Sequence, residues 1–441
     1  MIHKYQLLDR YVLLDAASGA VHEIDEQAYN LLDKITPPMS QTPPEALRLT
    51  VAECEIWAEL YNLQEQGMLF TPETDFPPMG ETPLKALCLH VAHDCNLRCG
   101  YCFASTGDFG GDRGLMSPEV GEKAIDYLLA RCKNRHNLEI DFFGGEPLMA
   151  MDTVKHVVDY ARKKAPEKNF RFTLTTNGVL LNDENIAYLN ETMDNVVLSL
   201  DGRRDVNNML RKTVSGGDSY DLIVPKYKKL LESRSGDYYI RGTFTAKNLD
   251  FVADIDAMEE QGFRQLSLEP VVLPNGHPLA ITEEHVEFVK QEYERLLERM
   301  LEGRDYSFFH FQVDLEQGPC IYKRTRGCGA GYEYAAVSPE GEVYPCHQFV
   351  GKPEYRLGTV FDGQLDAEIS AQFKSLSIST RNDCKSCWAK YYCSGGCSAS
   401  NLAVEGDINH CYSLGCELER KRLECAILLK VFSNDETVTE G

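Results

Sequence analysis

The chain has 441 residues, and with 45 Lys or Arg against 68 Asp or Glu its formal net charge is −23 at pH 7. This charge argues against a nucleic-acid partner, because phosphate binding needs a basic surface. No apolar segment approaches the roughly twenty residues of a membrane span, and the N-terminus carries no export signal. We therefore expect a cytoplasmic protein with no membrane partner. In a reducing compartment, the sixteen cysteines indicate metal or redox roles and not disulfides.

The length suggests about three domains. Residues 1–75 are predicted to be the first domain, followed by a proline-rich linker at 76–84. Thr50 and Glu53 predict a capping box at the start of a helix. The remaining expected elements of this domain are a hairpin at 11–15 and 20–24, helices at about 26–35, 44–49 and 51–66, and an extended piece at 68–70. This order predicts a small winged-helix module.

The charge of this module argues against the DNA binding for which winged helices are best known. Residues 1–75 contain four Lys or Arg and thirteen Asp or Glu. The arrangement resembles the leader-recognition domain of maturases that act on ribosomally made peptides. In that family, the leader adds a strand to the exposed edge of the sheet, where main-chain hydrogen bonds supply affinity. The alternative is a small domain that only supports the rest of the protein.

Residues 85–310 alternate strand and helix patterns six times, which predicts an α/β domain with a parallel sheet. Ser117 and Pro118 form a favourable helix start. Six units predict an open, partial (β/α)6 TIM barrel. The expected strands are 85–93, 138–143, 170–176, 195–200, 238–244 and 265–272, and the expected helices are 118–132, 152–164, 182–191, 220–233, 249–261 and 282–301.

Three cysteines, Cys95, Cys99 and Cys102, follow the first of these strands directly. Thiolates are ligands for iron–sulfur clusters and for tetrahedral zinc, and a set of three leaves one coordination position for a further molecule. The spacing resembles that of the radical S-adenosylmethionine enzymes. The resemblance implies a [4Fe–4S] cluster on these catalytic cysteines, whose open iron binds S-adenosylmethionine and generates a 5'-deoxyadenosyl radical. A zinc site completed by an outside ligand is the alternative.

Small and polar residues follow the later barrel strands, at the rim where α/β proteins bind ligands. The resemblance assigns the segment after the second strand to the ammonium group of S-adenosylmethionine, and the others are candidates for its ribose and carboxylate. Arg241 is an alternative cation for the carboxylate. The expected cofactor-binding residues are Gly144, Gly145, Glu146, Thr175, Asn177, Ser199, Asp201 and Arg211.

A second set of cysteines lies in residues 311–425, which we expect to form a separate domain followed by a tail at 426–441. The set resembles the SPASM extension, which implies two auxiliary [4Fe–4S] clusters and three clusters in all. Zinc is again the rival metal, because two-residue cysteine spacings also occur in zinc ribbons. The resemblance assigns Cys384, Cys387, Cys393 and Cys416 to the distal cluster and Cys328, Cys346 and Cys397 to the proximal one.

Two of these ligand assignments stay open. For the distal cluster we prefer Cys416 to Cys411, because the gap after Cys397 fits the SPASM pattern better. Cys320 is expected to complete the proximal cluster, unless a cysteine of the substrate takes that position. The four remaining thiols lie in apolar patterns and are predicted to be buried and inert: Cys54, Cys88, Cys132 and Cys425.

Segments 346–349, 391–397 and 414–418, together with the acidic N-terminal module, resemble the SCIFF maturases. This resemblance, to enzymes of the ranthipeptide and sactipeptide type, implies thioether formation in a cysteine-rich precursor peptide. It also implies an electron donor such as flavodoxin or ferredoxin. One alternative is the anaerobic sulfatase-maturing type, whose members place an aspartate where this chain has His347. The non-enzymatic alternative is a multi-cluster electron-transfer protein.

Overall fold

A parallel sheet forms the centre of the fold in the computed structural model, which describes residues 1–73, 80, 82–315 and 325–435. All of its neighbouring central strands run parallel, in the order in which they occur in the sequence. The six predicted strands are confirmed, each within two residues. They are β4 (Ala86–His93), β7 (Asn137–Gly144), β8 (Asn169–Thr176), β9 (Asn195–Ser199), β11 (Asp237–Phe244) and β12 (Gln265–Pro270).

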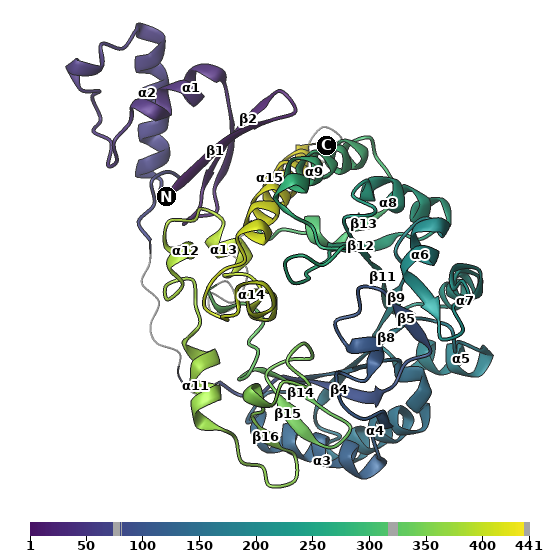
Figure 1. The fold of residues 1–441 in the computed structure, drawn as a ribbon. Coiled ribbons are helices and arrows are strands. Elements are labelled where there is room, and N and C mark those ends of the chain that lie inside the picture. The colour runs from purple at the N-terminus through teal and green to yellow at the C-terminus, as the bar shows by residue number, and fades with distance from the viewer. Residues whose placement is uncertain (74–79, 81, 316–324, 436–441) are drawn as a thin grey trace.

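A layer of helices covers the outer face of this curved sheet (Figure 1). Ser117 caps the first helix by accepting a hydrogen bond from the Val120 amide, as predicted. The helices between and after the strands are α3 (Pro118–Arg131), α4 (Met151–Lys164), α5 (Asp183–Thr192), α6 (Arg204–Leu210), α7 (Tyr220–Glu232), α8 (Phe251–Glu260) and α9 (Val286–Leu301). Of these, only α6 was not predicted.

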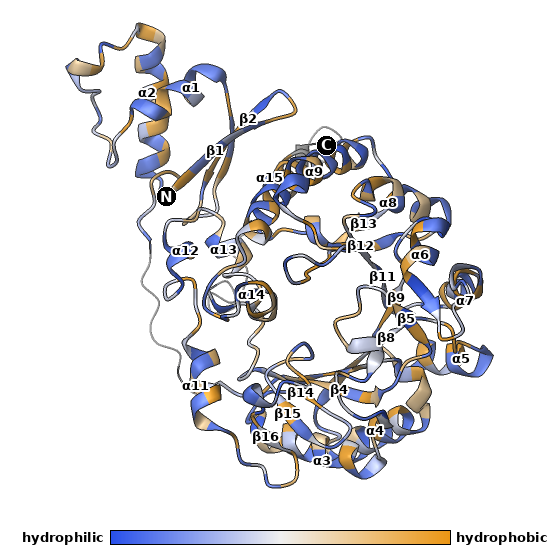
Figure 2. Cartoon of the chain, viewed as in Figure 1, coloured by the Kyte–Doolittle hydropathy of each residue, from blue (hydrophilic) through white to orange (hydrophobic). Residues whose placement is uncertain are grey.

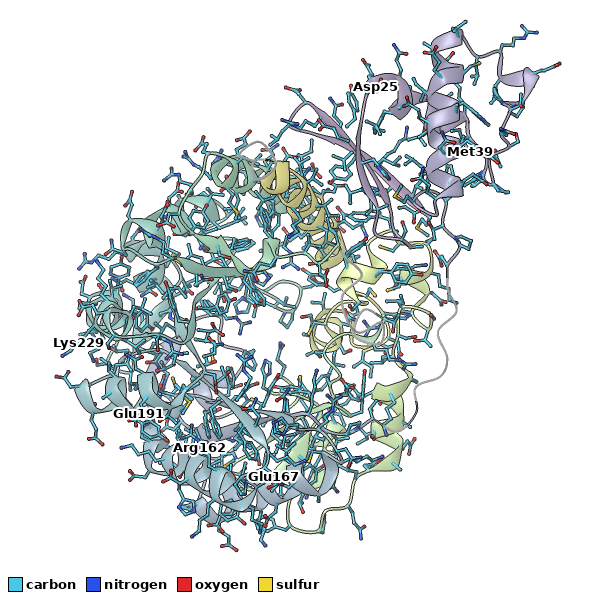
Figure 3. All side chains as sticks on the ribbon, turned by 180° about the vertical axis from the view of Figure 1, so that it is seen from behind. Asp25, Met39, Arg162, Glu167, Glu191 and Lys229 are labelled. Carbon is cyan, nitrogen blue, oxygen red and sulfur yellow. The ribbon has the colours of Figure 1, made fainter. Side chains whose placement is uncertain are left out.

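The polarity of the sequence explains this layering. All eight residues of β4 are buried, as expected for a parallel strand that is covered on both faces. The other central strands alternate apolar and polar residues, and the helices carry both hydrophobic and hydrophilic residues (Figure 2). Their polar sides face solvent: Arg162, Glu191 and Lys229 are exposed on the outer helices (Figure 3).

The sheet continues past the predicted domain boundary at 310–311. Strand β14 (Tyr334–Val337) pairs in parallel with β4, so the C-terminal region extends the sheet of the barrel. At the opposite edge, β13 (Ser307–Phe308) pairs with β12. The other short strands and 3-10 helices outside the N-terminal module are β5 (Leu97–Cys99), β6 (Gly114–Leu115), β10 (Arg211–Thr213), β15 (Glu342–Tyr344), β16 (Gly358–Thr359), η3 (Ser105–Gly107), η4 (Pro147–Ala150), η5 (Glu283–His285), η6 (Phe309–Phe311) and η7 (Pro353–Tyr355).

The C-terminal helices differ from the predicted arrangement at one boundary. The expected tail, 426–441, begins inside a helix that runs from Ser413 to Asp435. The helix continues because Ala426, Ile427 and Leu428 are buried. The helix packs along α9, and Ile427 clusters with Leu14 and Trp388. These helices are α11 (Ala367–Ser375), α12 (Asn382–Lys385), α13 (Lys390–Cys393), α14 (Ser398–Glu405) and α15 (Ser413–Asp435).

The N-terminal module combines a three-stranded antiparallel sheet with two α-helices and two 3-10 helices. Its sheet has the order β1-β2-β3 and lies beside α12, α13 and α15 (Figure 1). The elements are β1 (Ile2–Leu7), β2 (Arg10–Asp15), β3 (Val21–Ile24), α1 (Glu26–Leu31), η1 (Leu32–Lys34), η2 (Glu45–Leu47) and α2 (Val51–Glu65). None of the helices among the described residues combines the length and apolar composition that crossing a bilayer requires.

Three details of this module correct the sequence-based expectations. The hairpin and the capping box of Thr50 and Glu53 are confirmed, but β1 was missed. The helix expected at 44–49 is only a 3-10 turn, and 68–70 is not a strand. Leu69 is buried in the cluster around Trp57, so this segment packs on the helical side of the module instead of joining the sheet.

Candidate active site

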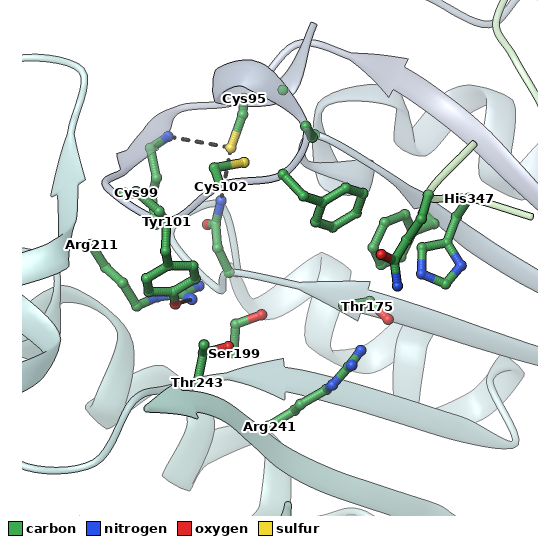
Figure 4. Close-up of a pocket in the computed structure, with 18 of the residues that line it drawn as sticks. Cys95, Cys99, Tyr101, Cys102, Thr175, Ser199, Arg211, Arg241, Thr243 and His347 are labelled. Carbon is green, nitrogen blue, oxygen red and sulfur yellow. Dashed lines mark hydrogen bonds between the residues drawn. The ribbon is translucent and has the colours of Figure 1, made fainter. Parts of the chain in front are cut away.

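A cavity of about 290 Å³ opens at the carboxyl ends of the barrel strands, the usual ligand position in such folds. Figure 4 shows cysteines on one side of it and side chains of the later strands on the other. Most of the residues expected there line it, whereas Glu146 and Asp201 do not. Those that line it are Cys95, Cys99, Cys102, Gly144, Gly145, Thr175, Asn177, Ser199 and Arg211.

The cysteine loop is held against a neighbouring strand and a neighbouring loop. Strand β5, which ends at Cys99, pairs with β10, so that Cys99 lies opposite Arg211. On the other side, the Asn177 amide group donates to Asn96 Oδ1 at 2.7 Å and lies 3.6 Å from Cys95 Sγ. Contacts with β10 and with the loop after β8 therefore position the segment that carries Cys95 and Cys99.

The paired glycines allow a close approach that any side chain would prevent. A Cβ on Gly145 would lie 2.2 Å from the Asp94 carbonyl oxygen, and one on Gly144 would lie 2.3 Å from that of Ala92. Instead, the Gly145 and Glu146 amides donate to the carbonyls of Ala92 and Asp94, at 2.8 and 2.9 Å. The glycines thus fasten the end of β7 to the segment that leads into Cys95, besides lining the cavity.

Glu146 has a different position from the one predicted. Its carboxylate is fully buried and accepts hydrogen bonds from the Leu148 and Asn177 amides and from the Thr176 hydroxyl, at 2.7 to 3.0 Å. Burial raises the pKa of Glu146, and these donors work against that shift. Because both oxygens are occupied, Glu146 ties two rim segments together and does not face the cavity.

Asp201 also lies behind the cavity wall. It accepts hydrogen bonds from the hydroxyl of Tyr101, at 2.7 and 2.9 Å, and from the Thr243 amide at 3.1 Å. Arg211 in turn donates to the Tyr101 oxygen at 2.7 Å and lies 3.7 Å from Asp201. Sequence reasoning missed Tyr101, although its place between Cys99 and Cys102 was a signal.

The cavity offers thiols that could bind a metal centre and an arginine that could bind a negatively charged ligand. Burial raises the pKa of Cys95 to about 12 and that of Cys99 to about 11, so that a metal is needed to hold these thiols as thiolates. Arg211 lines the same cavity, and its buried Nε has no hydrogen-bond partner. A cluster on the thiols and a carboxylate near Arg211 would satisfy both groups.

A charged pair forms part of the wall opposite the cysteines. Arg241, on β11, is ion-paired with Glu269, on β12, and both line the cavity. Burial alone would raise the pKa of Glu269, but Arg241 and His310 lower it below its usual value. Glu269 and Thr243 were missed from the sequence, although polar residues at the ends of the fifth and sixth strands were the available signal.

The cavity also reaches the C-terminal region. His347, Gln348 and Ser400 line it, and the first two directly follow the buried Cys346. Burial lowers the pKa of His347 to about 4, so its imidazole is neutral at pH 7. Its Nδ1 lies 3.2 Å from the Tyr334 hydroxyl oxygen, which leaves the other ring nitrogen available to a ligand.

The proximal trio, Cys328, Cys346 and Cys397, surrounds one small cavity of about 50 Å³. These are three residues that the sequence assigned to one auxiliary cluster, and the fold brings them together from separate segments. Burial raises the pKa of Cys346 above its usual value, which again favours a metal as the partner of the thiolate. Cys320, the suggested fourth ligand, lies outside the described residues.

The distal group contains five thiols, one more than the sequence assigned to the distal cluster. Cys384 Sγ and Cys411 Sγ are 3.7 Å apart, and Cys411 also contacts Cys416, whereas Cys393 lies near Cys387. Both candidates for the last ligand are therefore present at the site. The group consists of Cys384, Cys387, Cys393, Cys411 and Cys416.

One of the four thiols that were predicted to be buried and inert is exposed. Cys88, Cys132 and Cys425 are buried, as expected, but Cys54 is exposed on α2. The buried residues of that helix are Trp57 and Leu60, and Cys54 lies outside the stripe that they form.

Comparison with known families agrees with this architecture. Residues 89–244 match the model of the Radical SAM superfamily, and residues 328–388 match SPASM, an iron-sulfur cluster-binding domain. The chain therefore contains a radical SAM domain, which carries the first cysteine loop, and a SPASM domain, which carries the proximal trio in part.

Among characterised relatives, the chain is 27% identical to a cysteine-type anaerobic sulfatase-maturating enzyme of Clostridium perfringens, over 71% of this chain and 89% of the relative. It is 25% identical to the radical SAM cyclopropyl synthase TigE of Paramaledivibacter caminithermalis, over 76% and 72% of the two chains. It is 29% identical to the mycofactocin maturase MftC of Mycobacterium ulcerans, over 72% and 84%.

Solved structures show the same fold. The enzyme anSMEcpe, solved with bound AdoMet and Kp18Cys peptide, superposes with a TM-score of 0.67 and 23% identity, over 80% of this chain and 99% of that one. Streptococcus suis SuiB, bound to S-adenosylmethionine, superposes with a TM-score of 0.55 and 16% identity, over 94% and 98%. The fold class predicted from the sequence is thus confirmed for the partial barrel and the SPASM region.

Proposed function

We propose that this chain is a cytoplasmic radical S-adenosylmethionine enzyme of the SCIFF maturase type, which joins a cysteine sulfur to a carbon within a cysteine-rich precursor peptide. The observation that carries the proposal is the shared cavity. The loop of Cys95 forms one side of it, and His347, next to Cys346 of the proximal trio, forms part of another. A peptide in this cavity would lie between a radical source and a second metal site.

The cofactor assignment follows from the thiols. Cys95, Cys99 and Cys102 would hold the first [4Fe–4S] cluster, and the proximal trio and the distal group would hold one cluster each. When bound, the clusters and S-adenosylmethionine supply an electron, a 5'-deoxyadenosyl radical and an acceptor for the electron that returns. Arg211 would pair with the carboxylate of S-adenosylmethionine through its free Nε, and Tyr101 would keep Arg211 in place.

The proposed crosslink breaks one C–H bond and one S–H bond of the peptide and forms one C–S bond. The hydrogen atom of the carbon ends in 5'-deoxyadenosine, the thiol proton leaves, and one electron returns, so each crosslink costs the peptide two hydrogen atoms. His347 lines the cavity beside Cys346, where the ring nitrogen that does not face Tyr334 could hydrogen-bond the peptide. The Arg241–Glu269 pair would orient the peptide by binding its polar groups.

The N-terminal module is the proposed site for the leader of the precursor. Strand β3 forms an edge of the sheet and pairs with β2 alone among the described residues. An extended peptide could add a strand at this edge. An electron donor such as flavodoxin or ferredoxin completes the set of proposed partners.

The second candidate is formylglycine formation of the sulfatase-maturing type. The similarity to the Clostridium perfringens enzyme favours it. Two features of this chain favour the thioether reaction instead: the module formed by residues 1–73, and His347, with its neutral ring, in place of an aspartate after Cys346.

The test uses anaerobically reconstituted protein, S-adenosylmethionine, dithionite and the cysteine-rich peptide encoded nearest to its gene. We expect 5'-deoxyadenosine, a peptide that has lost two hydrogen atoms per crosslink, and one fewer alkylatable thiol per crosslink. A new aldehyde without loss of a thiol to carbon would favour formylglycine formation. Absence of 5'-deoxyadenosine would overturn the proposal that the chain is a radical S-adenosylmethionine enzyme of any type.

Cysteine variants separate the roles of the metal sites. Cys95→Ala is expected to abolish cleavage of S-adenosylmethionine and to remove about a third of the bound iron, since three clusters of four irons are proposed. Cys384→Ala should retain part of the cleavage but stop crosslinking. Cys54→Ala, at an exposed thiol outside all three sites, is the matched control and should behave like the wild type.

A further inference from the structure

The turn between β2 and β3 of the N-terminal module packs directly on the distal cysteine group. Ala16, which is completely buried, belongs to the same hydrophobic cluster as Cys384, Cys411 and Tyr391. Ala17 and Cys416 pack against this cluster from its edge. Residues nearly four hundred positions apart in sequence therefore enclose the same thiols.

The strands beside the turn make a second contact with the distal group. Leu14, also completely buried, clusters with Trp388 and Ala389, and Cys387 and Cys393 pack against them. The contact around Trp388 is extended by His3 of β1, whose ring stacks on the indole with centroids 3.9 Å apart and planes 3° apart. Trp388 directly follows Cys387 in the sequence, so this stacking fixes the backbone next to a thiol.

The turn has a defined shape of its own. The carboxylate of Asp15 is buried and accepts from the Ala17 and Ser18 amides at 3.0 Å and from the Thr71 amide at 2.9 Å. Gly19 has φ +82°, and a Cβ there would lie 2.9 Å from the Leu315 carbonyl oxygen. The turn is thus built to approach the C-terminal region closely, with small residues at the point of contact.

Polar contacts hold the module in this position. His3 Nε2 lies 2.9 Å from Glu424 Oε1, and the Tyr5 hydroxyl donates to the Glu424 carbonyl at 3.0 Å. Lys390, on α13, is almost fully buried and forms an ion pair with Glu73 at 2.7 Å. These contacts connect β1 and the end of the module to helices α13 and α15, which carry Cys393 and Cys416.

We propose that residues 14–17 form one wall of the distal metal site, and that the N-terminal module thereby protects the cluster held there from solvent and oxygen. The inference rests on the proposed cluster assignment for the distal group. The apolar shell around a metal site controls solvent access and, with it, stability and reduction potential. A module whose candidate leader site lies on β3 therefore also serves as the cover of a redox centre.

The experiment compares three variants of the full chain. Ala16→Leu adds volume at the contact with Cys384 and Cys411, and His3→Ala removes the stacking on Trp388 without adding any. Ala58→Leu, at an exposed alanine on α2 of the same module, is the control. Circular dichroism checks that each variant is folded, and if Ala16→Leu is not, His3→Ala decides the outcome.

The first measurement uses the metal-free, reduced chain. Alkylation of Cys384 and Cys411 by iodoacetamide, followed by peptide mass spectrometry, is expected to be at least about fivefold faster in Ala16→Leu and His3→Ala, since thiol reactivity follows access. Cys95 should be alkylated at the wild-type rate in all variants. Wild-type rates at Cys384 and Cys411 in both test variants would overturn the inference.

The second measurement uses reconstituted protein. In air, iron of the distal site should be lost about threefold faster in the two test variants than in the control, since solvent access to the cluster increases. Equal rates of loss would count against the inference. If the wild type binds no iron at the distal group, the cofactor proposal fails, whereas the alkylation result still decides whether the turn is a wall of the site.

Discussion

The hydroxyl of Tyr101 donates to both carboxylate oxygens of Asp201, at 2.7 and 2.9 Å, although the two residues are one hundred positions apart. Tyr101 lies between Cys99 and Cys102, and Asp201 follows β9. The bond therefore fastens the cysteine loop to the opposite part of the barrel rim. Arg211 reaches the cavity from the same group and donates to the Tyr101 oxygen at 2.7 Å.

Tyr101→Phe removes this link and leaves the buried carboxylate of Asp201 short of a donor. We expect a loss of about 1–3 kcal/mol in the free energy of unfolding, the usual cost of an unsatisfied buried group, and about tenfold slower formation of 5'-deoxyadenosine. Thermal unfolding and product chromatography measure the two effects. Tyr239→Phe, at a ring that packs edge-on against Phe309, is the control; an equal effect there would contradict the assigned role.

Gly145→Ala should displace the segment that leads into Cys95, because the new Cβ would meet the Asp94 carbonyl oxygen at 2.2 Å. We expect the chain to fold but to lose cleavage of S-adenosylmethionine by about a hundredfold, since small displacements of reacting groups are costly. Gly114→Ala is the matched control, because nothing lies within 4 Å of a Cβ at that position. Near wild-type cleavage in Gly145→Ala would argue against this role.

Arg241→Gln should separate peptide binding from radical formation. The side chain lines the wall of the cavity opposite the cysteines and pairs with Glu269. We expect crosslinking to fall about tenfold while 5'-deoxyadenosine formed without peptide changes less than about twofold, since only positioning of the peptide is lost. Arg264→Gln, which breaks a surface pair with Asp305, is the control. Equal losses of both products would assign Arg241 to the cofactor instead.

Asp141 should make stability depend on pH. Burial, with a contribution from the charge of Glu139, raises the pKa of Asp141 to about 7. The folded chain then keeps a proton that the unfolded chain releases near its ordinary pKa, so stability falls as pH rises from about 4 to about 7, by at most about 1.4 kcal/mol per pH unit.

Asp141→Asn should remove this dependence, which urea unfolding at pH 5, 6 and 7 would reveal as a flatter profile. Asp237→Asn, at an exposed residue of β11, should keep the wild-type slope. A variant profile as steep as that of the wild type would show that another group carries the dependence.

The barrel was readable from the sequence because its signals are local. The regular alternation of strand and helix patterns predicts a parallel sheet, and Ser117 with Pro118 marks a helix start. Two other elements were not readable: β1 is an edge strand that contacts α15, and the continuation of α15 past residue 425 depends on the surface that α9 offers. Such elements owe their form to partners distant in sequence.

The site shows the same division. The spacing of Cys95, Cys99 and Cys102 indicated metal chemistry, because the type and spacing of candidate ligands can be taken directly from the sequence. The roles of Glu146 and Asp201 were not readable, since a carboxylate at a strand end can face either the cavity or its supporting layer. The packing of the fold places both side chains in the supporting layer and not in the cavity.

The sequence by itself determined the spacing of the cysteines that we propose as metal ligands, the barrel strands and the acidic character of the N-terminal module, because composition and spacing specify these directly. The tertiary structure alone decided which residues meet: that Tyr101 bridges Arg211 and Asp201, that His347 reaches the cavity of Cys95, and that Ala16 covers Cys384. Contacts between distant segments depend on how whole elements pack, and no local pattern encodes that packing.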